Sequence, residues 1–310
     1  MITLIVPTRN RAHTLRLVAP SYFAQDGVSE LIFVSDAGDD DTPAVIAEIA
    51  RQYPEKVSRL LRNETRLGAS QSRNVGVAAS RNEFILFCDD DEHLEAGYAR
   101  ILLQKLQTPN VGAVSGRRIY LAPGESRASA LQRFGSGIRS SKMFRPLICE
   151  YVNGAKFAGD IVMPITNAII LTRKSLLQQF PYDSYYARGN GYREETDFQM
   201  NLFVHGFDIH VTNDCHSFHL PLSQVRTGGQ RTAPLKRLYW SIFYTRYFFG
   251  KYYERYAQRV GLKSPRWIAL LAFGIFAVYR ETLRPTLHAL AMLVLARRGA
   301  AAERHPRLSG

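Results

Sequence analysis

The chain has 310 residues, long enough for a large buried core, and we expect one α/β domain with a C-terminal extension. Its formal net charge of +13 indicates an anionic partner, which charge alone does not identify among nucleic acid, anionic lipid and phosphorylated substrate. The three cysteines, Cys88, Cys149 and Cys215, lie far apart without a Cys-x-x-Cys pair, which argues against a zinc site or a disulfide framework and favours a reducing cytoplasm.

The first ninety residues alternate predicted strands and helices. The first helix begins near His13 and is expected to bury Leu15, Leu17 and Val18. The predicted strands cover residues 2–6, 31–34, 57–61 and 84–88. No signal peptide precedes the first of them, so we expect the protein not to be exported. The rhythm is typical of a mostly parallel, doubly wound sheet, which binds ligands at the carboxyl ends of its strands.

Three consecutive aspartates, Asp89, Asp90 and Asp91, follow the apolar strand over residues 84–88. Carboxylates stacked at the end of a buried strand repel one another unless a cation or water neutralises them. Mg²⁺ or Mn²⁺ fits, because such an ion takes one or two protein carboxylates and completes its coordination with water and phosphate oxygens. The alternative is an acidic turn that caps the next helix.

The pattern changes after residue 106. Residues 122–160 are rich in Gly, Ser and Arg and lack clear periodicity, which suits a binding loop. Further strands are predicted over residues 111–118, 163–171 and 209–212, and helices over residues 174–180 and 198–205. An acidic run, Glu194-Glu195-Thr196-Asp197, stands directly before the second of these helices.

From residue 234 the chain is predicted to be helical, aromatic and basic. The apolar runs over residues 267–279 and 287–296 are shorter than the roughly 20 residues that span a bilayer. With Trp267 at one end and basic residues on the flanks, they suit helices that lie in the headgroup region of an anionic leaflet. The alternatives are packing on the preceding domain or another subunit, and a re-entrant hairpin through Pro285. We therefore expect domains over residues 1–232 and 233–310.

Five motifs stand in order along the chain: Val6-Pro7-Thr8-Arg9-Asn10, the loop around Asp36, the segment from Gly68 to Asn74, the Asp89 turn and Glu194-Glu195-Thr196-Asp197. Together they resemble the family 2 inverting glycosyltransferases, which have the nucleotide-sugar-binding GT-A type fold. The resemblance covers residues 1 to about 220. It implies a metal-dependent transfer, with Mg²⁺ or Mn²⁺, of a sugar from a nucleotide-diphosphate donor to a hydroxyl acceptor.

Carried over to this sequence, the resemblance implies that Pro7, Thr8 and Asn10 lie beside the nucleoside. Asp36 is expected to accept a hydrogen bond from the base. The family usually has two acidic residues where this chain has Ser35 and Asp36, and an Asp39-Asp40-Asp41 run replaces its usual turn, which leaves the base preference open.

The resemblance also assigns the middle of the donor site. Gly68 is expected to let the backbone approach the nucleotide. Arg73 is expected to pair either with an acidic loop or with a phosphate, and both alternatives stand.

In the acidic turn, the resemblance implies that Asp89 faces the ribose or a metal-bound water and that Asp91 holds the metal. Asp90 belongs to the nucleotide-sugar-binding group but is expected to point away from the metal, because neighbours at a strand end face opposite sides. His219 matches a histidine that gives some relatives a further metal contact, and the alternative is a surface histidine.

The other half of the reaction needs a carboxylate that deprotonates the acceptor hydroxyl. Glu195 stands at the position of the family's catalytic Asp, one methylene longer, and is the expected base, with Asp197 next and Glu194 beside them. Alternatively, these acidic residues only favour the first turn of a helix. Because the Gln-x-x-Arg-Trp motif of the processive synthases is absent, we expect single-sugar transfer.

The expected partners are a nucleotide-sugar donor, a lipid-linked or cell-envelope glycan acceptor and an anionic membrane surface, with no nucleic acid and an open oligomeric state. The protein is then expected in the cytoplasm, peripheral on the inner face of the cell membrane. Two other classes remain. A sugar nucleotidyltransferase would need a glycine-rich, basic loop after its first strand, and a non-catalytic basic membrane- or nucleic-acid-binding protein has no use for carboxylates at strand ends.

Overall fold

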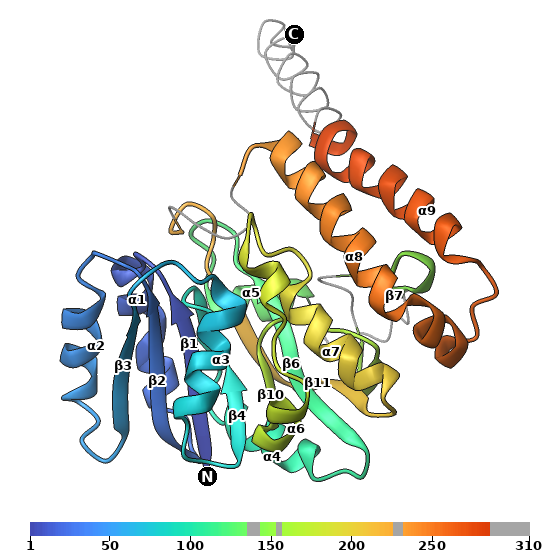
Figure 1. Ribbon diagram of the computed structural model, residues 1–310. Coiled ribbons are helices and arrows are strands. Elements are labelled where there is room, and N and C mark those ends of the chain that lie inside the picture. Colours follow the sequence, from blue (N-terminus) through green and yellow to red (C-terminus); the bar gives the residue numbers. More distant parts are fainter. Residues whose placement is uncertain (135–142, 153–156, 226–231, 286–310) are drawn as a thin grey trace, which may run out of the picture.

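The computed structural model describes residues 1–134, 143–152, 157–225 and 232–285. Within these ranges one sheet of nine strands forms the centre of the molecule, in the order β3-β2-β1-β4-β10-β6-β11-β5, with β9 on β11 (Figure 1). The strands are β1 (Ile2–Thr8), β2 (Val28–Asp36), β3 (Val57–Asn63), β4 (Phe84–Phe87), β5 (Glu92–Leu94), β6 (Val111–Tyr120), β9 (Asp160–Met163), β10 (Ile170–Arg173) and β11 (Asp208–His219).

The sheet is parallel from β3 through β2 and β1 to β4, and again between β6 and β11. β10 runs antiparallel between β4 and β6, and β5 and β9 pair antiparallel with β11. Every residue of β1 is buried, as expected for a strand covered on both faces. The prediction of a mostly parallel α/β sheet is therefore confirmed.

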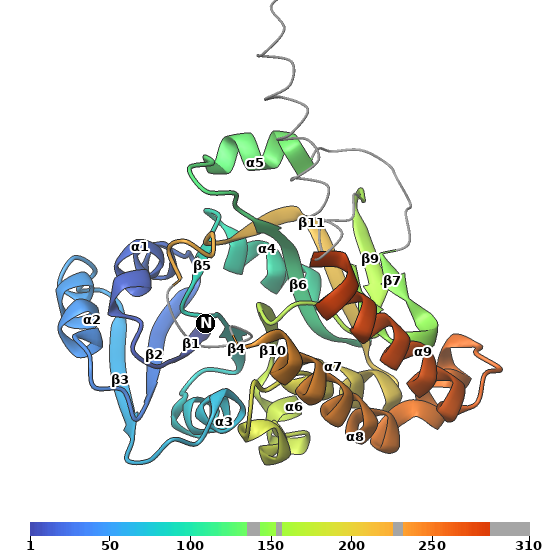
Figure 2. The same cartoon turned by 90° about the horizontal axis from the view of Figure 1, so that it is seen from above.

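Helices cover both faces of the sheet (Figure 2). On one face lie α1 (Ala12–Phe23), α2 (Thr42–Ala50) and α4 (Tyr98–Leu106), whose apolar side chains share one core with β1 and β2. On the other face lie α3 (Ala69–Ala79), α6 (Lys174–Gln179) and α7 (Glu194–Val204). Gly76 lets α3 lie close to β1, because a Cβ there would stand 2.5 Å from Ile5 Cγ2.

Short elements fill the segment for which no periodicity was found. They are α5 (Arg127–Phe134), the 3₁₀ turn η1 (Pro146–Ile148) and a hairpin of β7 (Phe144–Arg145) and β8 (Glu150–Tyr151). A second 3₁₀ turn, η2 (Ser184–Ala187), precedes α7. Cys149, between η1 and β8, is buried like the other two cysteines.

Up to residue 285, the C-terminal part consists of α8 (Pro234–Val260), α9 (Arg266–Val278) and the π-helical turn η3 (Tyr279–Leu283). The aromatic face of α8 packs on α7, where Phe248 and Tyr252 join Met200 and Phe203 in one buried cluster. The packing alternative is thus correct for that face. Among the described helices, none combines the length and the apolarity needed to cross a bilayer.

α9 keeps an apolar face outward, with Trp267, Leu271 and Ile275 all more than half exposed. Whether this face meets a membrane stays a prediction, as does the domain boundary at residue 232. The predicted apolar run over residues 287–296 lies outside the described residues.

Three expectations from the sequence are wrong in detail. Leu17 is exposed, because the buried stripe of α1 follows Leu15, Val18 and Tyr22 at helical spacing. The strand predicted over residues 163–171 is broken between β9 and β10. There the Asn167 side chain donates through Nδ2 to Gly116 O and accepts through Oδ1 from the backbone N–H of Ile169. The helix predicted from residue 198 starts at Glu194, so its acidic residues form its first turn.

Candidate active site

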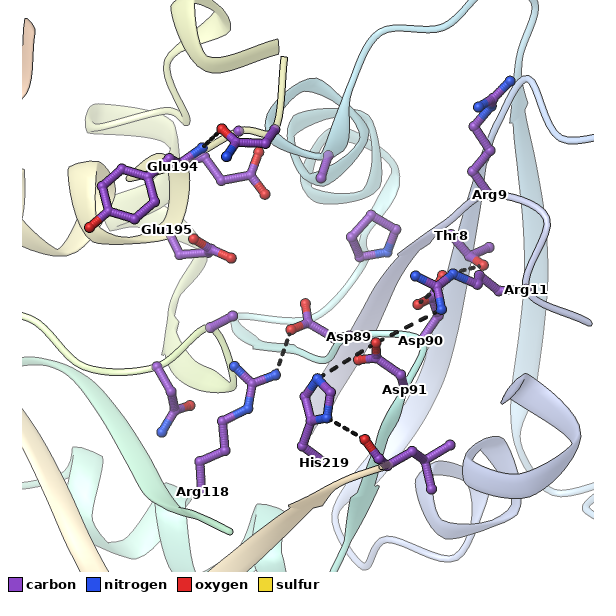
Figure 3. A pocket seen from close by; sticks show the side chains of 18 of the residues that line it. Thr8, Arg9, Arg11, Asp89, Asp90, Asp91, Arg118, Glu194, Glu195 and His219 are labelled. Carbon is purple, nitrogen blue, oxygen red and sulfur yellow. Dashed lines mark hydrogen bonds and ion pairs between the residues drawn. The ribbon is translucent and has the colours of Figure 1, made fainter. Parts of the chain in front are cut away.

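A cleft of about 1450 Å³ opens at the carboxyl ends of β1, β2 and β4. Figure 3 shows the aspartates that follow β4 on one side of it and the first turn of α7 on another. The predicted site residues that line it are Pro7, Thr8, Asn10, Asp36, Gly68, Arg73, Asp89, Asp90, Asp91, Glu194, Glu195 and His219. Parallel strands end at one edge of a sheet, which brings these distant segments together.

The fully buried guanidinium of Arg73 joins the two acidic groups of the cleft. From α3, its Nη1 donates to Glu194 Oε1 at 2.7 Å and its Nη2 to Asp89 Oδ1 at 3.2 Å. Glu195 Oε1 lies 4.0 Å from Nη2, and only 2% of the Arg73 side chain is exposed. Of the two alternatives predicted for Arg73, the structure therefore shows the ion pair with the acidic residues.

Two further arginines reach the acidic turn, and the sequence analysis named neither. Arg118, from β6, donates through Nη2 to Asp89 Oδ2 at 3.0 Å and through Nε to Glu92. Arg11, at the start of α1, lies 3.8 Å from Asp90 and 4.0 Å from Asp91. Arg11 adjoins the Val6-to-Asn10 motif, which was a usable signal, whereas nothing in the sequence near Arg118 pointed to the site.

The cluster around the aspartate turn and the first turn of α7 has more acidic than basic side chains, because six carboxylates there pair with only three guanidiniums. Burial raises the pKa of Asp90 to about 7, with a further contribution from Asp91, and burial raises the pKa of Glu92 to about 8. Asp89 is the exception, because Arg118 and Arg73 outweigh burial and lower its pKa. The cluster therefore favours the arrival of a cation.

Asp91 and His219 offer a pair of ligands for such a cation. His219 Nδ1 lies 2.6 Å from the carbonyl oxygen of Leu220, which only accepts, so the proton sits on Nδ1 and the lone pair on Nε2. That Nε2 faces Asp91 Oδ2 at 3.7 Å. Burial, then the nearby Arg118, lower the pKa of His219, which keeps the imidazole neutral.

Two acceptor atoms that face each other fit a metal ion with few protein ligands, which completes its coordination with water and phosphate. No three His, Cys, Asp or Glu side chains of the described residues converge in a preformed metal site. The chemistry of these two side chains thus fits a hard divalent ion such as Mg²⁺ or Mn²⁺ that takes its other ligands from outside the protein.

Asp90 turns toward β1, where it accepts a hydrogen bond from Thr8 Oγ1 at 2.8 Å. Asp36 accepts from the backbone amides of Leu67 and Gly68, at 2.7 and 2.9 Å, so it shapes the loop that leads into α3. Asn10 is held against Asp39 by two hydrogen bonds. The predicted contacts of these residues with a nucleoside stay predictions.

Glu195 is the carboxylate of α7 best placed to meet a substrate. Glu194 is engaged by Arg73 at 2.7 Å, while the Glu195 side chain is 30% exposed and lies farther from Arg73, at 4.0 Å. Burial raises the pKa of Glu195, with Arg73 opposing and Asp89 adding to the rise. A carboxylate with a raised pKa is a stronger base than an ordinary one.

Asp197 does not line the cleft, which corrects its assignment as the next candidate base. Two residues along a helix correspond to about 200° of rotation, so Asp197 faces α8 when Glu195 faces the cleft. There it binds Lys251 Nζ at 2.9 Å and accepts hydrogen bonds from Tyr186 and Tyr252. Its contacts tie α8 to α7.

Comparison with known proteins supplies a family. Residues 3–180 match the model of Glycosyl transferase family 2. A sequence relative described as an uncharacterized glycosyltransferase of Haemophilus influenzae is 33% identical over 116 residues, 37% of each protein. The GalNAc(5)-diNAcBac-PP-undecaprenol beta-1,3-glucosyltransferase of Campylobacter jejuni is 30% identical over 105 residues, 34% of each protein. The chain thus matches only about a third of the length of these curated relatives.

The fold extends the likeness to most of the chain. The mannosyltransferase PcManGT of Pyrobaculum calidifontis, solved with GDP-Man and Mn²⁺, superimposes with a TM-score of 0.58 at 18% identity, over 98% of this chain and 80% of that one. This similarity supports the predicted GT-A type fold.

Proposed function

This chain belongs to glycosyl transferase family 2, and we propose that it moves a single sugar from a nucleotide-diphosphate donor to a hydroxyl group of an acceptor, with inversion at the anomeric carbon. One observation carries the proposal. Asp91 and Glu195, more than a hundred residues apart in sequence, line one cleft, and Arg73 links their neighbours Asp89 and Glu194.

At the donor end, the bond that breaks joins the anomeric carbon to the diphosphate, so negative charge builds on the leaving group. Asp91 and His219 would hold the metal ion, which supplies a Lewis acid that stabilises this charge. Arg11 and Arg118 add fixed positive charge beside them. The excess of carboxylates over guanidiniums in this cluster supports the use of a divalent ion.

At the acceptor end, Glu195 takes the proton of the attacking hydroxyl. The oxygen of that hydroxyl bonds to the anomeric carbon from the face opposite the diphosphate. The proton ends on Glu195, and the electron pair of the broken bond leaves with the nucleoside diphosphate. Arg73 pairs with Glu194 and also lies 4.0 Å from Glu195, so its positive charge partly opposes the rise that burial causes in the pKa of Glu195. Glu195 therefore stays acidic enough to release its proton between turnovers.

We further propose that the acceptor is a lipid-linked or cell-envelope glycan and that the protein works on the inner face of the cell membrane. Residues 233–310 hold 14 of the 40 Lys and Arg but only three of the 27 Asp and Glu. The same region presents the outward apolar face of α9, a combination that suits an anionic membrane surface. The Campylobacter jejuni relative bears the name of an enzyme for a PP-undecaprenol saccharide.

A screen of UDP- and GDP-sugars with Mg²⁺ or Mn²⁺ tests the proposal by release of nucleoside diphosphate. We expect wild type to hydrolyse or transfer one donor slowly in the absence of a known acceptor, and Asp91→Ala to lose most of that release. Arg51→Ala, at an exposed position outside the cleft, is the control. Equal release by wild type and Asp91→Ala would remove the metal role of Asp91.

A further inference from the structure

The cleft has a second charged end, formed where the C-terminal helices close it. Arg237 from α8 and Arg280 from η3 both line the cleft, and one carboxylate holds them together. Glu281 Oε2 accepts from Arg237 Nε and Glu281 Oε1 from Arg280 Nε, each at 2.7 Å. Because Glu281 is nearly fully buried, it fixes the two guanidiniums as a pair.

A second carboxylate, Glu150, extends this cluster toward the first turn of α7. It accepts hydrogen bonds from Tyr192 Oη at 2.6 Å and from Arg193 Nη2 at 2.7 Å. Arg280 bridges the two halves, since its Nη1 donates to Tyr192 Oη at 3.3 Å and lies 3.8 Å from Glu150. We call Glu150, Tyr192, Arg193, Arg237, Arg280 and Glu281 the basic end of the cleft.

Some N–H groups of the basic end have no hydrogen-bond partner among the described residues. Its three arginines face two glutamates, so it carries one positive charge in excess. The guanidinium of Arg193 donates hydrogen bonds to Glu150, to Thr245 and to the carbonyl oxygens of Ile148 and Cys149. By contrast, the Nη2 groups of Arg237 and Arg280 form no hydrogen bond with the described residues, and these side chains are 30% and 26% exposed.

The position of the basic end relates it to the acceptor rather than to the donor. Tyr192 and Arg193 directly precede Glu194 and Glu195, so this end adjoins the proposed base. Arg193 has a left-handed backbone with φ of 78°, which turns the chain sharply at the junction with α7. The aspartates Asp89 to Asp91 belong to a different part of the fold, the turn that follows β4.

We propose that Arg237 and Arg280 bind a phosphate ester carried by the acceptor. This assignment rests on the proposed function and names its substrate class. Paired guanidiniums match the several oxygens of a phosphate, and their donors are pre-positioned by Glu281. The two charged ends also orient the acceptor, because its phosphate is attracted to the basic end and repelled by the acidic one, which leaves its hydroxyl toward Glu195.

Full-length protein and three simple probes test the proposal by titration calorimetry. Octyl phosphate carries the phosphate ester, octyl glucoside has the same chain without phosphate, and inorganic phosphate has no chain. We expect wild type to bind octyl phosphate in preference to both other probes. Arg237→Gln and Arg280→Gln should each weaken octyl phosphate by about tenfold, the loss of roughly one charge-assisted hydrogen bond.

Controls separate binding from folding. Arg51→Gln removes an exposed arginine outside the cleft and should bind like wild type. Arg237 makes no ring contact in the described structure, whereas Arg280 lies over Tyr192 and Phe276, so Arg237→Gln is the safer variant if Arg280→Gln unfolds. Thermal unfolding of each variant reports which of them remain folded.

Two results overturn the proposal: octyl phosphate binding that is unchanged in Arg237→Gln, or inorganic phosphate that binds as tightly as octyl phosphate. Binding of UDP and GDP with Mn²⁺ is measured on the same proteins and should not change in Arg237→Gln. Absence of nucleotide binding in wild type would instead overturn the proposed function, so the two failures are distinguishable.

Discussion

Replacing Arg73 with Met should destabilise the fold more strongly than any other single change in the cleft. The guanidinium is 2% exposed and pairs with Glu194 and Asp89 at 2.7 and 3.2 Å, with Glu195 at 4.0 Å. Removing one partner of a buried ion pair leaves uncompensated charge, which costs about 3–5 kcal/mol. Methionine fills a similar volume, so the loss reports charge rather than a cavity.

The pH dependence of this loss identifies its cause. In wild type, burial raises the pKa of Glu194 from 4.5 to about 7, so its stabilising contribution is complete below pH 4.5 and is lost as pH rises through about 7. Without Arg73, the pKa of Glu194 rises further and that of Asp89 is no longer lowered as strongly. The variant should therefore lose more stability at pH 8 than at pH 5.

Urea unfolding of wild type and Arg73→Met at pH 5 and pH 8 measures the free energies, and Arg51→Met is the matched exposed control. A stability difference that is equal at both pH values, or below about 1 kcal/mol, would refute the ionic role of Arg73, because exposed pairs contribute no more than that.

Three further outcomes are expected. Glu195→Gln should lower kcat by about 10²–10⁴-fold with nucleotide binding retained. Asp197→Asn should mainly lower stability in urea and leave kcat within a few-fold of wild type. The reverse pattern would show that Asp197 rather than Glu195 is the base. The rate of transfer should fall with acid at a pH above the ordinary 4.5 of a glutamate, because the pKa of Glu195 is raised, and an acid limb at or below 4.5 would argue against Glu195 as the base. Paired Trp267→Glu and Leu271→Glu changes should abolish co-sedimentation with anionic vesicles, and unchanged sedimentation would count against the α9 face as the membrane contact.

The elements that could be predicted from sequence are those whose signals are local. The strand over residues 84–88 shows its burial through consecutive apolar residues, and the aspartates that follow it mark a strand end at the site. Resemblance then linked this turn to Glu194 and Glu195 across more than a hundred residues. Composition and periodicity alone carry no information on that pairing, because it depends on sheet order.

What could not be predicted depends on which segments pack together. Arg118 reaches Asp89 only because β10 lies beside β4 and β6 lies beside β10, and no pattern around Arg118 marks it. Asp197 was the second candidate base because the resemblance points to this acidic run as a whole. The helix starts at Glu194, and helical geometry then turns Asp197 to α8. The role of the aromatic residues of α8 was ambiguous from sequence, because burial against α7 and contact with lipid favour similar side chains.

We expect the Asp89–Asp91 turn and Glu195 to act on the same bound donor. A crystal structure with Mn²⁺ and UDP or GDP tests this most directly. We predict an anomalous manganese peak between Asp91 and His219, with the terminal phosphate in the cleft on the side that faces Glu195. A nucleotide bound elsewhere, or a manganese peak with no contact to Asp91, would contradict the proposed mechanism.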